Sequence, residues 1–173
     1  MTTTDAPAIR IIKTASCPSL SGKSKLTYEI ACSSEAVDDQ SEIALRVSTN
    51  TGGGFFSDEW LPLAAVEKIV TGSAANKGLT STTLHPLFKG KSINTAGFLL
   101  AVLKAEGAVQ LQEGKTRLYE VGDFEGFMAT TRALMKATPA PKGKAAPAKT
   151  TPPGAKATPP ARKTIQRAAA KRA

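Results

Sequence analysis

The chain has 173 residues, a net charge of +9 and a sequence pI of about 9.7, which leaves room for one ordinary domain and an appendage. One histidine and two cysteines are too few for the usual three or four ligands of a metal site, so the sequence predicts neither metal nor cofactor. No apolar run approaches the roughly 20 residues of a membrane span, and MTTTDAPAIR lacks the apolar centre of a signal peptide. We therefore expect an intracellular protein with reduced thiols and no membrane segment.

The positive charge is concentrated in the C-terminal part of the chain. Thirteen lysines and arginines and all fourteen acids lie before residue 136, so this part is nearly neutral. The ten remaining bases follow without a single acid. The net charge of the whole chain therefore belongs to its last segment.

The N-terminal third predicts a small antiparallel sheet over residues 8–50, after a flexible segment at 1–7. Apolar and polar residues alternate, or β-branched residues cluster, in three runs at 8–14, 25–32 and 42–48. The connections are rich in Pro, Gly, Ser and Asp, as turns are. Gly22-Lys23-Ser24 is similar to the end of a phosphate-binding P-loop, but Cys17 stands where that motif needs glycine, so we expect an exposed turn.

A helical part is predicted to follow a flexible joint at Gly52-Gly53-Gly54. The first helix is expected from Asp58, whose acid suits the N-terminal end, to about Gly72. Pro62 would lie within the first turn, and one apolar face would carry Trp60, Leu63, Val66, Ile69 and Val70. Phe55 and Phe56, just before this helix, are expected to fill the core.

Four further elements complete the predicted domain. A short helix at 80–88 is limited by Pro86, and a longer one at 93–106 is capped by Ser92 and ended by Gly107. VQLQEGKTRLYEV predicts a hairpin around Glu113-Gly114. A closing helix, capped by Asp123, is expected to run from Phe124 to about Lys136. The fold class predicted is therefore α+β.

The element order over residues 57–136 resembles a winged helix-turn-helix domain, with the closing helix added. In that family the third helix enters the DNA major groove and the hairpin, or wing, contacts the backbone. The resemblance implies base contacts by the early third helix, at Ser92, Asn94 and Thr95. It implies phosphate contacts before that helix and in the hairpin, at Lys89, Lys91, Lys115 and Arg117. The third helix is poor in basic and amide side chains, so it is alternatively the core helix of the domain.

The segment 137–173 predicts a disordered cationic tail. Apart from Ile165 it holds no large apolar residue, so burial cannot offset the entropy of ordering it, and its prolines keep it extended. Its composition resembles the C-terminal tails of linker histones and of bacterial histone-like proteins. Such a tail binds phosphates by counterion release, without reading bases. The phosphate-binding residues expected here are Lys136, Lys142, Lys144, Lys149, Lys156, Arg162, Lys163, Arg167, Lys171 and Arg172.

Together these features predict a DNA-binding protein, a small transcriptional regulator or a nucleoid-associated protein, with a possible homodimer through residues 124–136. Two alternatives stay open. One is an RNA-binding protein, since a cationic tail does not distinguish the two acids. The other is a protein-binding adaptor or inhibitor that the tail tethers to nucleic acid. Catalysis is not expected, because the only histidine, His85, precedes Pro86 with no orienting acid nearby.

Overall fold

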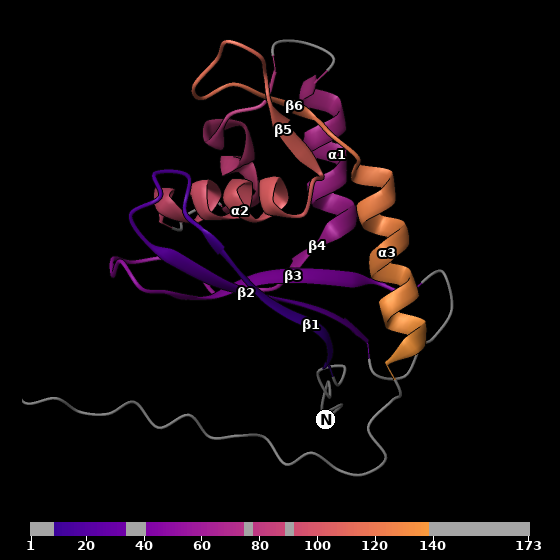
Figure 1. Cartoon of the computed structure of the whole chain (residues 1–173). Coiled ribbons are helices and arrows are strands. Elements are labelled where there is room, and N and C mark those ends of the chain that lie inside the picture. Colours follow the sequence, from indigo (N-terminus) through magenta and orange to yellow (C-terminus); the bar gives the residue numbers. More distant parts are fainter. Residues whose placement is uncertain (1–8, 34–40, 75–77, 89–91, 139–173) are drawn as a thin grey trace, which may run out of the picture. The chain divides into compact units, whose positions relative to one another are not determined.

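The structure, a computed structural model, describes residues 9–33, 41–74, 78–88 and 92–138 and has the predicted α+β class (Figure 1). Helices cover one face of an antiparallel sheet, and a two-stranded hairpin lies beyond them. In chain order the elements are β1 (Ile9–Pro18), β2 (Lys25–Ser33), β3 (Ile43–Asn50), β4 (Leu61–Pro62), α1 (Leu63–Ala74), the 3₁₀ helix η1 (Ser81–Phe88), α2 (Ile93–Ala105), β5 (Val109–Leu111), β6 (Tyr119–Val121) and α3 (Phe124–Ala137).

The four-stranded sheet has the order β1-β2-β3-β4, and every neighbouring pair is antiparallel. Its inner face is apolar because alternate residues of β2 and β3, among them Leu26, Ile30 and Leu45, are completely buried. In β1 the register slips between Ile11 and Lys13, so Ile12 is an extra residue that forms a bulge. The three strands expected within 8–50 are thus confirmed, although β1 continues to Pro18.

The first helix begins at Leu63, so the prediction of a helix from Asp58 is wrong. Leu61 and Pro62 instead pair with Leu45 and Ala44 of β3 as a short fourth strand. Pro62 disfavours the α conformation for the residue before it, Leu61. The edge of β3 gives Leu61 a strand to pair with and a buried position. The helix also passes Gly72 and ends at Ala74.

Trp60 consequently does not belong to the apolar face of α1. It precedes β4, and the guanidinium carbon of Arg46 lies 4.5 Å from the centroid of its ring. The buried face of α1 carries Leu63, Val66 and Val70, as expected. Phe56 packs edge-on against Phe98 with ring centroids 5.9 Å apart.

The remaining helices form where the sequence predicts them. The short helix is a 3₁₀ helix that contains Pro86. At the start of α2 the Oγ of Ser92 accepts a hydrogen bond from the Asn94 amide, and after its end Gly107 has a φ of +77°, a conformation that favours glycine. At the start of α3 a carboxylate oxygen of Asp123 accepts a bond of 2.8 Å from the Gly126 amide.

The hairpin is also confirmed, with strands β5 and β6 joined by a loop in which Gly114 has a φ of +68°. It is tied to the rest of the domain by Leu79, because Leu79 and Tyr119 exchange two main-chain hydrogen bonds of 2.7 and 2.8 Å. The hairpin is therefore fixed at its base next to the start of η1.

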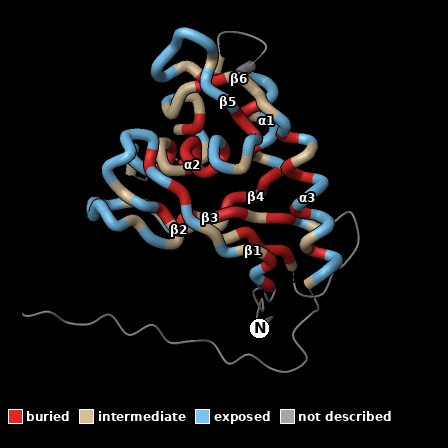
Figure 2. Tube along the Cα trace, in the orientation of Figure 1, coloured by how far each residue is buried: buried red, intermediate tan, exposed pale blue. Residues whose placement is uncertain are grey.

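Sheet and helices share one hydrophobic core (Figure 2). The helix α2 lies within it, and every residue from Leu99 to Leu103 is buried. The predicted sheet region at 8–50 and the helical part at 57–136 are thus packed as one body, while 139–173 lie outside the described residues. No helix in the described part of the chain has the length and apolarity needed to cross a membrane.

Candidate nucleic-acid interface

Two predicted phosphate-binding residues come together in the hairpin loop. Lys115 and Arg117 are both exposed between β5 and β6, and the loop is closed by a hydrogen bond of 3.1 Å from the Lys115 amide to the Gln112 carbonyl. Within the described residues, neither side chain has an ion-pair or hydrogen-bond partner. Both cations are therefore available to an anionic ligand.

The predicted residues at the start of α2 have different environments. Asn94 is exposed, and Ser92 donates a hydrogen bond of 2.6 Å from its Oγ to the Phe55 carbonyl. Thr95 is only 2% exposed, and its Oγ1 accepts a hydrogen bond of 2.9 Å from the Ser57 amide. The prediction that Thr95 is an exposed, groove-facing residue is wrong because this side chain anchors the connection before β4. Lys89 and Lys91 lie outside the described residues.

The burial of α2 limits what this helix can contact. A groove-binding helix needs an exposed face along several turns. In α2 the exposed positions are Ile93 and Asn94 in the first turn, together with Lys104 and Ala105 at the end, whereas the middle is enclosed. The burial of α2 agrees with the alternative expectation that this helix is the core of the domain. Any contact of α2 with bases would be restricted to its first turn.

The cationic segment starts from a fixed point. Lys136 is exposed in the last turn of α3. Next to it the guanidinium of Arg10 donates hydrogen bonds to the carbonyls of Met135, at 3.2 Å, and of Thr138. Arg10 is itself 5% exposed, so the origin of the cationic segment is tied to β1. The other predicted bases of that segment lie outside the described residues.

The role of Arg10 was not predicted from the sequence. The sequence does contain one signal, because Arg10 lies between isoleucines in a predicted strand. If its side chain is on the buried face of the sheet, the guanidinium requires hydrogen-bond acceptors there. The acceptors, however, are main-chain carbonyls at the end of a helix more than a hundred residues away. No residue pattern marks such a partner.

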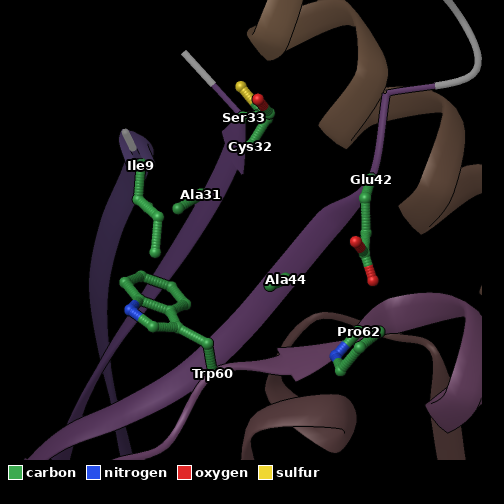
Figure 3. Close-up of a pocket in the computed structure, with 8 residues that line it drawn as sticks. All are labelled: Ile9, Ala31, Cys32, Ser33, Glu42, Ala44, Trp60 and Pro62. Carbon is green, nitrogen blue, oxygen red and sulfur yellow. The ribbon is translucent and has the colours of Figure 1, made fainter. Parts of the chain in front are cut away.

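The outer face of the sheet holds a second feature that the sequence did not reveal. A pocket of about 240 Å³ lies there, and in Figure 3 the Trp60 ring reaches over the sheet toward Ile9 of β1. Small residues, Ala31 and Ala44, form its floor. Beside it Arg46 forms an ion pair of 2.7 Å with Glu29.

Phe55, which was expected in the core, is instead 92% exposed, so its prediction is wrong.

A polar cluster on the inner side of the sheet joins β1, β2 and the end of α2. The Nζ of Lys13 donates to both carboxylate oxygens of Glu106, at 2.6 and 2.7 Å, and the Tyr28 hydroxyl donates to the same carboxylate. Burial, followed by this hydrogen bond, raises the pKa of Tyr28 far above its usual range. Burial, and secondly the charge of Glu106, raises the pKa of the Cys17 thiol. Lys13, Tyr28 and Glu106 thus hold the sheet to the helix.

The two cysteines are free and buried, at opposite ends of the β1–β2 pair, since Cys17 pairs with Leu26 and Cys32 with Arg10. The turn between these strands contains Gly22-Lys23-Ser24, where an exposed turn was predicted. The Gly22 amide donates a hydrogen bond of 2.8 Å to the Ser19 carbonyl. Among the described residues, no group of three or more His, Cys, Asp or Glu side chains could hold a metal ion.

Comparisons with models of known protein families, with curated proteins and with solved structures find no match to this chain.

Proposed function

We propose that the protein binds nucleic acid, DNA in the first place, through the cationic segment that begins at Lys136. The observation that supports this is the charge distribution: acids and bases balance up to residue 135, and only bases follow. Duplex DNA carries one negative charge per roughly 1.7 Å, and a chain without acids neutralises phosphates and releases counterions. The segment supplies affinity and a fast association rate without sequence preference.

The folded domain adds a second contact in this proposal. Lys115 and Arg117 project from the hairpin loop without partners among the described residues, as a wing that contacts phosphates requires. The winged-helix-like unit therefore remains part of the proposal, with Asn94 as the exposed α2 residue nearest to a base-reading role. On this basis the protein is a small transcriptional regulator or a nucleoid-associated protein.

Proposed dimer formation through residues 124–136 has to use the exposed side of α3. The apolar side chains Phe124, Phe127, Met128 and Met135 are buried against the same chain. Ala129 and Ala133 lie on the exposed side. Analytical ultracentrifugation of the wild type and of Ala133→Glu tests this arrangement, because a charge in the interface would shift a dimer to monomer.

A protein-binding adaptor is the second candidate, and two observations favour it. The enclosed α2 leaves little surface for base reading, and the outer face of the sheet offers the apolar pocket beside Trp60. In this case the cationic segment holds the adaptor near nucleic acid. Crosslinking of the Trp60→Ala variant against the wild type separates the candidates, since only the adaptor would lose a protein partner while retaining DNA.

The central experiment removes the cationic segment without disturbing the domain. The chain is cut after Thr138, because Arg10 binds the Thr138 carbonyl. A full-length variant with the nine bases after Thr138 replaced by glutamine serves as the matched control for length. Gel shifts from 50 to 200 mM salt should show affinity falling by about 10³-fold or more for the wild type, and a much smaller decrease for both variants. Unchanged DNA affinity in the variants would refute the proposal.

The choice between DNA and RNA is tested with the same full-length protein. Duplex DNA, single strands and structured RNA compete for one labelled duplex at fixed salt. DNA binding as proposed predicts that duplex DNA competes best. Stronger competition by structured RNA would assign the cationic segment to RNA instead.

A further inference from the structure

A polar cleft lies between the hairpin, η1 and the turn after β1. Its volume is about 560 Å³, which is within the usual range for small-ligand sites. Hydroxyl side chains from three separate parts of the chain border it, on Ser21, Thr80, Ser81, Thr82 and Thr116. The hairpin base is fixed there by the paired main-chain hydrogen bonds between Leu79 and Tyr119. The opening is thus held in shape by the fold.

The charge at this cleft has a single sign. Arg117 is the one charged residue among those that border it, and no carboxylate is present to compete for the guanidinium. Hydroxyl groups donate and accept hydrogen bonds, and together with an arginine fork they match the oxygens of a phosphate. A metal cation would find no carboxylate ligand here, so an anion is the better fit.

The donors are also open to a ligand. Thr80 and Thr83 are engaged with one another, with 3.2 Å between their hydroxyl oxygens. The hydroxyls of Ser81 and Thr82 have no hydrogen-bond partner within the described part of the chain, and the same holds for the guanidinium of Arg117. Arg117 and these two hydroxyls border the cleft from two different elements, one from the hairpin and two from η1.

The inner wall is less polar. Leu100 of α2 is completely buried beneath the cleft, and Tyr119 of β6 is 5% exposed. A phenol is protonated at neutral pH, and burial raises the pKa of Tyr119 further, so its hydroxyl is a hydrogen-bond donor. An apolar wall behind an anion-binding rim suits a phosphate that carries a sugar.

We propose that this cleft binds the phosphate group of a nucleotide, held between Arg117 and the hydroxyls of Ser81 and Thr82. The inference rests on the proposed function and gives the folded domain its own phosphate site, separate from the cationic segment. The phosphate is either an internal phosphodiester or the terminal phosphate of a strand or free nucleotide. Both present the same oxygens to the cleft.

The test is an amide chemical-shift titration of the full-length protein. The probes are inorganic phosphate, a thymidine tetranucleotide without terminal phosphate, and the same tetranucleotide with a 5′-phosphate. Saturable shifts at Ser81, Thr82 and Thr116 are expected. The Arg117→Gln variant should weaken binding at these amides by about ten-fold, as loss of a charged hydrogen bond does. Lys68→Gln, which removes an exposed base on α1 outside the cleft, should not.

The three probes separate the sources of the phosphate. Shifts with the unphosphorylated tetranucleotide assign the cleft to internal phosphodiesters, and shifts only with the 5′-phosphate or inorganic phosphate assign it to terminal or free phosphate. Absence of cleft shifts with all three probes overturns the proposal. If residues 139–173 still respond to the tetranucleotides, the proposed function survives, and if they too are silent, both proposals fail.

Discussion

The guanidinium of Arg10, near the start of β1, donates a hydrogen bond of 3.2 Å to the main-chain carbonyl of Met135, near the end of α3. The last carbonyls of a helix have no partners within it and carry partial negative charge. A cation at that point satisfies them and needs no carboxylate. One buried arginine thus joins the first strand of the domain to its last helix.

We expect Arg10→Met to lower the free energy of unfolding by about 1.5–3 kcal/mol, because charged hydrogen bonds to the Met135 and Thr138 carbonyls are lost. Methionine retains much of the buried apolar volume. Urea unfolding followed by circular dichroism measures the change, with Arg132→Met as the control, since Arg132 is exposed on the same helix. Equal stability of the two variants would contradict the role given to Arg10.

Glu106→Gln should destabilise the domain by about 2 kcal/mol through loss of the charged hydrogen bonds from Lys13 and Tyr28. The glutamate side chain is 10% exposed, so water replaces these partners poorly. Thermal unfolding of this variant is compared with that of Glu67→Gln, which changes an exposed acid on α1. A melting temperature as high as that of Glu67→Gln would show that the cluster contributes nothing to stability.

Both tyrosines should resist ionisation in the folded protein, because burial raises the pKa of Tyr28 and of Tyr119. In the unfolded chain a phenol loses its proton near pH 10. Above that pH the unfolded state therefore binds fewer protons than the folded state, and stability falls as the pH rises. Phenolate absorbance of the folded protein should lag behind that of the denaturant-unfolded protein. Coinciding titration curves would sink this expectation.

The two thiols should be inert in the folded protein. Cys17 is 4% exposed and Cys32 is 3% exposed, and burial raises the pKa of the Cys17 thiol, which keeps it from forming the reactive thiolate. A disulfide-exchange reagent should release about two equivalents only after denaturant is added. Rapid reaction in native buffer would mean that the β1–β2 pair opens readily.

Much of the architecture could be predicted because its signals are local. The caps at Ser92 and Asp123 and the glycine at 107 mark helix ends through contacts within a few residues. The alternation in β2 and β3 likewise reports a sheet with one buried face. These elements were expected within a few residues of their observed bounds.

The failures share a different cause, since each depends on partners far along the chain. Leu61 joins β3 rather than a helix, and Thr95 is buried because the Ser57 amide reaches it. The bulge at Ile12 breaks the alternation that would have extended the predicted strand to Pro18. In the candidate site, the exposed position of Lys115 and Arg117 could be predicted, because the sequence marks a hairpin loop at Glu113-Gly114. The hydroxyl groups that border the cleft with Arg117 could not, because they come from three separate segments.

The extra residue at Ile12 has a consequence for the solubility of the protein. It reverses the alternation of β1, so that Arg10 on one side of the bulge and Lys13 on the other both reach the helical side of the sheet. Removal of Ile12 would leave Arg10 and Lys13 on the helical side of the sheet, but it would straighten an edge strand rich in isoleucine. A straight, regular edge is a template on which another molecule can add its own strand, and the irregular one blocks such intermolecular growth.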